Sequence, residues 1–344
     1  MNQNQVLIIA EAGVNHNGSL ETATKLVDAA AEAGADMVKF QTFSADQMVT
    51  TSARKAEYQN QTTDALESQH DMIRKLELSR EMHEELIAYC RLCDIEFFST
   101  GFDTQSIDML VELGLEQFKI PSGEITNLPY LRHVGQYGKS VIISTGMANL
   151  GEIEAALEVL ETSGTPRNQI TVLHCNTEYP TPMEDVNLRA MISIGEVFKV
   201  SVGYSDHTLG DQACLAAVAC GARIIEKHFT LDHNYSDFRD HQLSANPAEM
   251  ADLVKRVRQF ETLLGSGKKV ASQVETEIEP AVRRSIVTRR ELSAGHILER
   301  KDLTWVRPAG GMAPGRESEL VGNLLCHSVM AGHQLSPEDV EKST

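Results

Sequence analysis

The sequence predicts a (β/α)8 TIM barrel followed by a small all-β module. Two observations indicate the barrel: eight short apolar runs recur along the chain, and a helix-like segment follows each run. The runs are continuously apolar rather than alternating, which is typical of parallel strands buried on both faces. Eight evenly spaced units over about 260 residues favour a closed barrel over the competing interpretation, a doubly wound open sheet.

The expected elements follow one another in order. The strands are expected at Val6–Gly13, Met37–Thr42, Ile95–Thr100, Gln117–Ser122, Ser140–Thr145, Ile170–Asn176, Val200–Ser205 and Ala222–Phe229. The helical segments between them include Leu20–Ala33, Glu152–Leu160 and Asp211–Ala219. Ser44–Ser79 is too long for a simple connection, so we expect it to form an excursion over the barrel mouth.

The pattern changes after Glu261. Leu264-Gly-Ser-Gly-Lys-Lys269 and the polar stretch that follows it are typical of a linker. The expected organisation is therefore a catalytic barrel at residues 1–264, a linker at 265–281 and a second domain at 282–344. A domain of about 60 residues is small to stand alone, so we expect it to pack on something.

A weak internal repeat runs through this last segment. Ala294-Gly-His-Ile-Leu298 precedes Asp302, and Ala331-Gly-His-Gln-Leu335 precedes Asp339. Between the two halves, Arg307 stands next to a proline and ahead of a Gly-Gly loop. It is the basic residue of this segment that we select as a candidate, although a turn arginine can also be simply exposed.

Composition restricts the partners. The chain has 31 Lys and Arg against 49 Asp and Glu, a formal net charge of −18 at pH 7, which disfavours nucleic acid and anionic membranes. No apolar run approaches the roughly 18 residues of a membrane helix, and Met1–Gln5 lacks the features of a signal peptide. The six scattered cysteines fit reduced thiols. We therefore expect a cytoplasmic protein.

Polar side chains end every expected strand. In strand order they are Glu11; Lys39 and Gln41; Ser99 and Thr100; Lys119, Ser122 and Glu124; Ser144 and Thr145; Asn176, Thr177, Glu178 and Tyr179; Ser205, Asp206 and His207; Glu226, Lys227 and His228. The carboxyl ends of barrel strands converge on one rim, where active sites of this fold lie. Eight polar ends on one rim predict an active site there.

Two subsets indicate its chemistry. Cations and hydroxyls suited to phosphate or carboxylate are Lys39, Thr100, Lys119, Ser122, Ser144 and Ser205. His207 and His228 end adjacent strands, so their imidazoles can meet as a two-His metal site requires, or as a hydrogen-bonded pair. Asp206 and Glu226 are available to orient these rings.

Several ordered motifs closely resemble the sialic acid synthase family. They are Ile9-Ala-Glu-Ala-Gly-Val-Asn-His-Asn-Gly18, Val38-Lys-Phe-Gln-Thr42, Lys119-Ile-Pro-Ser-Gly-Glu124, Ser144-Thr-Gly-Met147, His174-Cys-Asn-Thr-Glu-Tyr-Pro-Thr-Pro182, Gly203-Tyr-Ser-Asp-His207 and Glu226-Lys-His-Phe-Thr230. The final segment, with Arg307-Pro and the Ala-Gly-His repeats, resembles the family's antifreeze-like (SAF) domain. The resemblance runs from about residue 6 to residue 340.

The resemblance implies condensation of phosphoenolpyruvate with the open-chain aldehyde of an N-acylated mannosamine, releasing phosphate and a nine-carbon 2-keto sugar acid. N-acetylmannosamine is the expected substrate, and 2,4-diacetamido-2,4,6-trideoxymannose, the legionaminic acid precursor, is the alternative. It also implies a divalent metal, with Mn²⁺ expected ahead of Mg²⁺ or Co²⁺, acting as a Lewis acid toward the aldehyde. A homodimer that exchanges its C-terminal domain is implied too, with Arg307 entering the partner's barrel.

The family's residues carry over by position. Lys39, Thr100, Lys119, Ser122, Ser144 and Ser205 match residues that hold phosphoenolpyruvate, and His207 and His228 match the metal ligands. Gln41, Asn176 or Thr177, Tyr179 and Asp240 match residues around the sugar and the metal-bound water, and Glu11, Glu124, His228 and Arg307 are the catalytic candidates. The loop Ser236–His241 departs from the family pattern, so Asp237 is an alternative to Asp240.

Two rival functions need to be weighed. A Schiff-base aldolase could use Lys39 or Lys119 to form an imine with a keto acid, without metal or phosphate ligands. A non-enzymatic glycan-binding protein could use the C-terminal module, but it would leave the polar strand ends unexplained.

Overall fold

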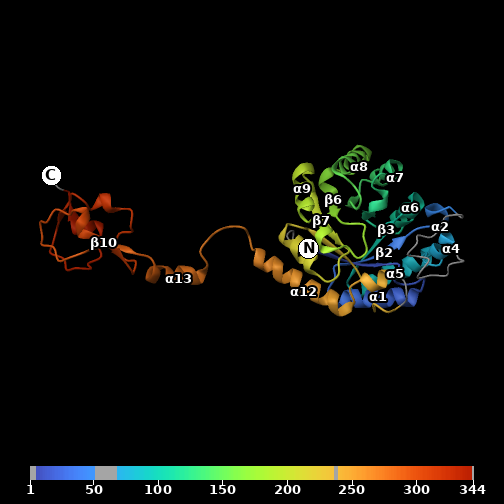
Figure 1. Cartoon of the computed structure of the whole chain (residues 1–344), viewed down its shortest axis with the longest axis horizontal. Coiled ribbons are helices and arrows are strands. Elements are labelled where there is room, and N and C mark those ends of the chain that lie inside the picture. The colour runs from blue at the N-terminus through green and yellow to red at the C-terminus, as the bar shows by residue number, and fades with distance from the viewer. Residues whose placement is uncertain (1–4, 51–67, 236–238, 343–344) are drawn as a thin grey trace. The chain divides into compact units, whose positions relative to one another are not determined.

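The computed structural model describes residues 5–50, 68–235 and 239–342. They form two compact units, residues 1–265 and 266–344 (Figure 1). The first unit ends at residue 265, and the expected barrel domain ended at residue 264. Each unit is described by itself below.

The first unit is a closed barrel of eight parallel strands in sequential order. The strands are β1 (Leu7–Gly13), β2 (Met37–Thr42), β3 (Glu96–Gly101), β4 (Gln117–Ile120), β5 (Ser140–Ser144), β6 (Ile170–His174), β7 (Ser201–Asp206) and β8 (Ile224–His228). Pairing of β1 with both β2 and β8 closes the ring. The predicted barrel is confirmed, and the open sheet is excluded.

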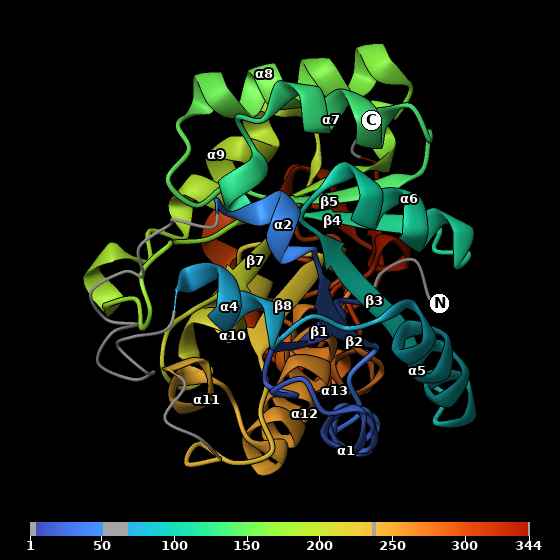
Figure 2. The same ribbon diagram turned by 90° about the vertical axis from the view of Figure 1, so that its right-hand side faces the viewer.

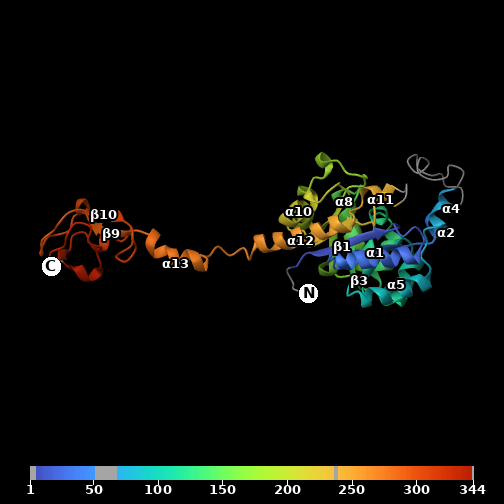
Figure 3. The ribbon, with the colours of Figure 1, turned by 90° about the horizontal axis from the view of Figure 1, so that it is seen from below.

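Helices cover the outside of the barrel, as Figure 2 shows for α1, α5, α7 and α8. The helices of the unit are α1 (Leu20–Glu32), α2 (Ala45–Met48), α4 (Gln69–Arg74), α5 (Arg80–Leu92), α6 (Thr104–Glu112), α7 (Leu128–Gly135), α8 (Leu150–Ser163), α9 (Arg189–Phe198), α10 (Gln212–Ala219), α11 (Arg239–Leu243) and α12 (Pro247–Leu264). Short 3₁₀ turns span Ser122–Glu124, Arg167–Gln169 and Met183–Asp185. α12 packs against α1 and α10, so the last helix lies beside the first (Figure 3).

Local signals explain several helix ends. Asn149 and Asn246 precede α8 and α12 in capping boxes. In each, the asparagine side chain accepts the backbone N–H of the third helical residue, a glutamate, and the side chain of that glutamate accepts the backbone N–H of the asparagine. Gly34 follows α1 at φ 81°, a conformation that costs glycine little. Of the predicted excursion at 44–79, α2 and α4 are described, and residues 51–67 lie outside the described residues.

The barrel interior is arranged in layers. Ile9, Met37, Phe98, Ile142, Leu173 and Ile224 form an apolar floor contributed by six strands. Two residues further along their strands come Glu11, Lys39, Thr100, Ser144 and Glu226. Because side chains alternate between the two faces of a strand, this second set also points inward and lies on the floor. The floor therefore supports the polar layer.

The second unit contains α13 (Gln273–Val282), β9 (Ser285–Thr288), β10 (Leu303–Val306), β11 (Leu324–Leu325) and β12 (Val340–Glu341). Short 3₁₀ turns span Arg300–Asp302, Glu317–Glu319 and Pro337–Asp339. β9 pairs with β10 and β11 with β12, both antiparallel, around a core that includes Ile286, Leu292, Leu298, Leu303 and Leu335. The predicted small β module is confirmed.

The segment expected as a linker, residues 265–281, contains most of a helix. Residues 265–267 form a turn and residues 268–272 have no regular secondary structure, but α13 occupies most of the remainder. Ser272 accepts the backbone N–H of Glu275 in a capping box. This Ser-x-x-Glu pattern was a readable helix start that the polar composition obscured. Among the described residues, no helix combines the length and apolar character that a membrane span requires.

Candidate active site

A cavity of about 650 Å³ lies at the carboxyl ends of the barrel strands. This volume is in the range of small-molecule sites, about 300–1,000 Å³. The predicted residues that line it are Glu11, Lys39, Gln41, Thr100, Lys119, Ser122, Ser144, Thr177, Tyr179, Ser205, His207, His228 and Asp240. Phe102, Met147, Cys175, Glu178 and Glu226 line it as well. The structure thus brings together most of the residues selected from the strand ends.

Two buried lysines are held by hydroxyls of neighbouring strands. Lys39 Nζ donates to Thr100 Oγ1 at 3.0 Å, and Lys119 Nζ donates to Ser144 Oγ at 2.7 Å. Both lysines are only 3% exposed, so their ammonium groups are presented to the cavity with little competing water. Ammonium and hydroxyl donors in such a setting suit an anion that carries phosphate and carboxylate oxygens.

Glu226 is a buried carboxylate beside these ammonium groups. Its Oε2 lies 3.4 Å from Lys39 Nζ, its Oε1 lies 3.6 Å from Lys119 Nζ, and Ser205 donates to Oε1 at 2.8 Å. Burial alone would raise the pKa of Glu226, but the charges of Lys119 and Lys39 outweigh it and lower that pKa to about 2. Glu226 is therefore ionised at neutral pH and offsets part of the lysine charge.

The pKa of Glu11 is raised, whereas that of Glu226 is lowered. Its Oε2 lies 2.7 Å from Lys39 Nζ, and Gln41 Nε2 donates to its Oε1 at 3.2 Å. Burial raises the pKa of Glu11 to about 6, against the attraction of Lys39 and with a contribution from the charge of Glu226. A carboxyl group with this pKa can hold or release a proton near neutral pH, as general acid–base catalysis requires.

His207 and His228 face each other with ring centroids 5.4 Å apart. Tyr179 lies over His207 at 4.2 Å between centroids. Desolvation lowers the pKa of His207 and lowers that of His228 further, which favours neutral imidazoles. Neutral imidazoles are the form that binds a metal.

The donor atoms of this pair fit a metal ion. The backbone carbonyl of Asn176 accepts a hydrogen bond from His207 Nδ1, which leaves the Nε2 lone pair free to ligate. Among the described residues, the buried Nδ1 of His228 has no hydrogen-bond partner. Within the described part of the chain, no third His, Cys, Asp or Glu completes a ligand set with these two histidines. Water or substrate oxygen would have to supply the remaining ligands.

Of the two acidic residues expected to orient the histidines, neither is shown to do so. Asp206 turns away from the cavity: its Oδ2 lies 2.7 Å from Lys227 Nζ and accepts from Cys214, and its Oδ1 accepts the Thr208 N–H. The backbone of Asn176 orients His207 instead. Glu226 does point inward, but it contacts the lysines and Ser205. Side chains alternate between the two faces of a strand, so Ser205, His207, Glu226 and His228 share the inner face. Asp206 and Lys227 lie on the other face and pair with each other.

Hydroxyl groups line the wall between β4 and β6. Ser122 Oγ accepts the backbone N–H of Gly146 at 2.9 Å, and Thr177 lies close by. A Cβ added at Gly146 would stand 2.2 Å from Thr177 Oγ1 and 2.9 Å from Ser122 Oγ. Any larger residue at this position would therefore push both hydroxyls out of place.

Three of the residues that the family resemblance assigns to the site lie outside the cavity lining. Glu124 lines an adjoining hollow, where its Oε2 accepts from Asn127 Nδ2 at 2.6 Å. The side-chain amide of Asn176 donates to the carbonyl of Asp185 and lines a different hollow. Arg307 belongs to the second unit and is exposed. The alternative Asp237 lies outside the described residues.

A closed parallel barrel with buried lysines, hydroxyls and paired imidazoles at its strand ends is the architecture of a (β/α)8 enzyme with a site for a small anion. Known families identify the chain further. The NeuB family matches residues 26–269, and the SAF domain matches residues 283–341. The chain belongs to the NeuB family, the sialic acid synthase type of enzyme that carries a C-terminal SAF domain.

Two relatives share the greater part of this chain. An N,N'-diacetyllegionaminic acid synthase of Campylobacter jejuni is 52% identical over 93% of this chain and 96% of its own length. An N,N'-diacetyllegionaminic acid synthase of Legionella pneumophila is 47% identical over 97% of this chain and 94% of its own. The crystal structure of an N-acetylneuraminic acid synthetase from Leptospira borgpetersenii is 33% identical, with a TM-score of 0.69, over 79% of this chain and 90% of that one.

Proposed function

We propose that this protein condenses phosphoenolpyruvate with 2,4-diacetamido-2,4,6-trideoxymannose and water, giving N,N'-diacetyllegionaminic acid and phosphate. The observation that carries the proposal is the 52% identity, over 93% of the chain, to a relative named for that product. This reverses the order expected from the motifs alone, in which N-acetylmannosamine came first. The sugar-binding motifs are similar in both branches, so only the comparison over the whole chain favours the legionaminic substrate.

The cavity supports phosphoenolpyruvate as the anionic substrate. Lys39 and Lys119 would offset its charge, and the hydroxyls of Thr100, Ser144 and Ser205 would donate hydrogen bonds to its oxygens. The same geometry makes an imine less suitable, because the ammonium of Lys39 is engaged by Glu11 and Thr100, and that of Lys119 by Ser144. The lysines would therefore act as cations.

The proposed reaction forms two bonds between heavy atoms and breaks one. Of the two protons that water loses, one balances the new hydroxyl group of the sugar acid and the other leaves with phosphate. Carbon 3 of phosphoenolpyruvate bonds to the aldehyde carbon, the oxygen of water bonds to carbon 2, and the bond from carbon 2 to the bridging oxygen breaks as phosphate leaves. In its protonated form Glu11 can supply a proton to the former aldehyde oxygen, since its pKa is raised to about 6. Glu124, in the adjoining hollow, stays a candidate base for the water step.

We also propose that His207 and His228 hold a divalent ion, most suitably Mn²⁺. The tautomer of His207 and the unpartnered Nδ1 of His228 support this assignment. When bound, the ion would supply Lewis-acid activation of the sugar aldehyde. The ligand type, two imidazoles, does not by itself select Mn²⁺ over Mg²⁺ or Co²⁺, so the metal preference rests on the family resemblance.

The resemblance also supports a homodimer in which each SAF domain serves the partner's barrel. Arg307 would then complete an active site in trans, and an exposed guanidinium suits a contact with an anionic substrate. Domain exchange of this kind is a low-cost route to a two-fold dimer.

The test of the proposed substrate is phosphate release measured with each sugar in turn. Purified protein, phosphoenolpyruvate and Mn²⁺ are supplied with the diacetamido sugar, with N-acetylmannosamine or with no sugar. We expect release above the no-sugar rate with the diacetamido sugar and a much smaller kcat/KM with N-acetylmannosamine. Equal or higher kcat/KM with N-acetylmannosamine would contradict the legionaminic assignment.

A further inference from the structure

The second unit contains two similar halves. Each residue of the first half corresponds to the residue 37 positions later in the second half. Leu292 and Val329, which are 37 positions apart, exchange both backbone hydrogen bonds with each other at 2.9 Å. The backbone N–H of Gly295 donates to Leu325, and that of Gly332 donates to Thr288, again at an offset of 37. These reciprocal bonds relate the halves by an approximate two-fold axis, so equivalent positions can be compared directly.

In the first half, a buried carboxylate is neutralised by an arginine. Asp302 has a fully buried side chain, and its Oδ1 accepts from Arg290 Nη2 at 2.8 Å. Its Oδ2 accepts from His296 Nε2 at 2.8 Å and from the backbone N–H of Glu299 at 3.1 Å. The triad is thus one carboxylate, one imidazole and one permanent cation.

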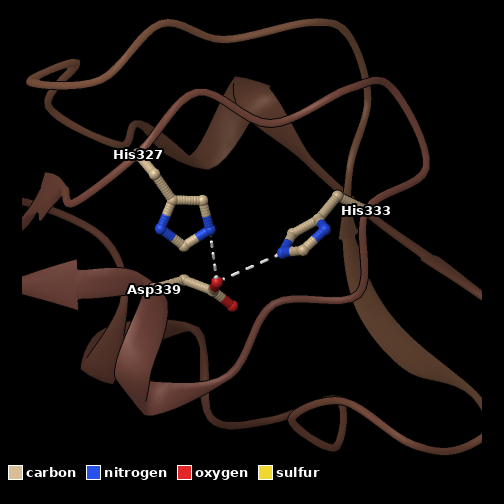
Figure 4. A group of neighbouring side chains, drawn as sticks. All are labelled: His327, His333 and Asp339. Carbon is tan, nitrogen blue, oxygen red and sulfur yellow. Dashed lines mark hydrogen bonds and ion pairs between the residues drawn. The ribbon is translucent and has the colours of Figure 1, made fainter.

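In the second half, a histidine replaces the arginine. The equivalents of Arg290, His296 and Asp302 are His327, His333 and Asp339, each 37 positions further along. Oδ1 of Asp339 lies 3.1 Å from Nε2 of His327 and 3.2 Å from Nε2 of His333, so both imidazoles point at one oxygen (Figure 4). The other oxygen, Oδ2, accepts the backbone N–H and the hydroxyl of Ser336. One oxygen of the Asp339 carboxylate is thus used in the 3₁₀ turn that contains it, and the other contacts both histidines.

The second half lacks the permanent positive charge that balances the carboxylate in the first half. The side chain of Asp339 is only 9% exposed, whereas that of His327 is 54% exposed. The nearly buried carboxylate of Asp339 therefore has, in place of an arginine, the imidazole of His327, which an ion from solvent can reach.

We propose that His327, His333 and Asp339 form a divalent cation site, and that Zn²⁺ is the ion they suit best. Two imidazole nitrogens and one carboxylate oxygen with water in the fourth position form a common Zn²⁺ ligand set. With zinc–ligand bonds of about 2.0–2.1 Å, neighbouring ligands of a tetrahedral ion are roughly 3.3 Å apart. The nitrogen-to-oxygen separations of 3.1 and 3.2 Å are close to that value. The ion would take the place that the guanidinium of Arg290 takes in the first half.

The site would stabilise the second unit. His327 and Asp339 flank the strand pair β11–β12, because β11 ends just before His327 and β12 begins just after Asp339. An ion that binds only the folded unit stabilises it in proportion to the logarithm of its concentration over Kd. This site is distinct in residues from the pair His207 and His228 in the barrel, and it does not depend on the proposed enzymatic function.

The test counts bound Zn²⁺ per chain in the full-length protein by equilibrium dialysis and native mass spectrometry. His327→Arg installs the residue of the first half, so it should fold and should bind one ion fewer than the wild type. The reciprocal change, Arg290→His, should bind one ion more. His133→Arg is the matched control, because His133 pairs with Asp108 without a second imidazole, and it should leave the count unchanged.

Thermal unfolding supplies a second readout. Zn²⁺ should raise the Tm of the second unit in the wild type and not in His327→Arg. Equal ion counts in wild type and His327→Arg, with both folded, would overturn the proposal. If His327→Arg does not fold, the count for Arg290→His decides, and no gain would overturn it. Co²⁺ in place of Zn²⁺ gives a spectrum in which a thiolate charge-transfer band, from Cys326 or another cysteine, would also overturn the assignment.

Discussion

Lys119 and Glu226 form an ion pair inside the barrel, with Nζ 3.6 Å from Oε1, in the lining of the cavity where an anionic substrate would bind. Glu226 also lies 3.4 Å from Lys39, so one carboxylate offsets part of the charge of two ammonium groups. Glu226 thereby offsets one of the two positive charges of these lysines. A substrate anion must compete with Glu226 for the same cations.

The first prediction follows from this competition. Glu226→Gln keeps the size of the side chain but leaves two buried lysines with less compensation, so stability without ligand should fall by on the order of 3 kcal/mol. Phosphoenolpyruvate should then bind more tightly and raise the Tm more than in the wild type. Ser205→Ala is the control, since it removes one hydrogen bond to Glu226 and should cost about 1 kcal/mol. Chemical denaturation with and without phosphoenolpyruvate measures both, and a Glu226→Gln protein as stable as Ser205→Ala would contradict the account.

The second prediction separates cationic lysines from imine-forming ones. Lys119→Met should raise the KM for phosphoenolpyruvate by on the order of 10–100-fold, because a charged hydrogen-bond donor is lost, and Lys119→Arg should retain more of the affinity. Borohydride added during turnover should leave no adduct. A reduced substrate adduct on Lys39 or Lys119 in a mass spectrum would favour the Schiff-base aldolase instead.

The third prediction concerns the barrel metal. Excess chelator should abolish phosphate release and Mn²⁺ should restore it. His207→Ala should lose Mn²⁺ binding together with activity, because the remaining His228 offers a single imidazole. His133→Ala, a change at a residue outside the lining of this cavity, should keep both. Undiminished turnover in excess chelator would show that His207 and His228 are only a packed pair.

The barrel and the polar strand ends were predictable because both depend on local periodicity. Continuous apolar runs show where parallel strands lie, and the residues that end them must converge once the barrel closes. The bounds of β2 agree with the prediction, and those of the other strands differ by at most a few residues at either end.

The parts that sequence reasoning missed depend on which face of a strand a residue occupies and on distant partners. Asp206 and Glu226 looked equivalent at the strand ends, yet alternation points Glu226 to the lysines and Asp206 to Lys227. The outcome for Glu124 depends on the path of the chain beyond β4, where a 3₁₀ turn carries it into the adjoining hollow. Neither position follows from residue type alone.

The fourth prediction tests the shared active site. Lys119→Met and Arg307→Ala are mixed under conditions that allow dimers to exchange. Activity is assayed at a phosphoenolpyruvate concentration far below the raised KM of Lys119→Met, where each variant alone should be nearly inactive. If Arg307 acts in trans, each mixed dimer has one intact site, and roughly a quarter of wild-type activity should return, since about half of the dimers are mixed. Matching thermal melts of the two variants are the control. An inactive mixture of demonstrably exchanged dimers would place Arg307 in its own chain's site or outside any site.

The central claim is the identity of the sugar, and a competition in one reaction tests it most directly. The protein receives equal concentrations of 2,4-diacetamido-2,4,6-trideoxymannose and N-acetylmannosamine with limiting phosphoenolpyruvate and Mn²⁺, and a mass spectrum quantifies the two sugar acids. Their ratio equals the ratio of the two kcat/KM values. We expect N,N'-diacetyllegionaminic acid to dominate by at least about 10-fold, as a difference of 1–3 kcal/mol in sugar contacts would give. A product mixture dominated by N-acetylneuraminic acid would contradict it.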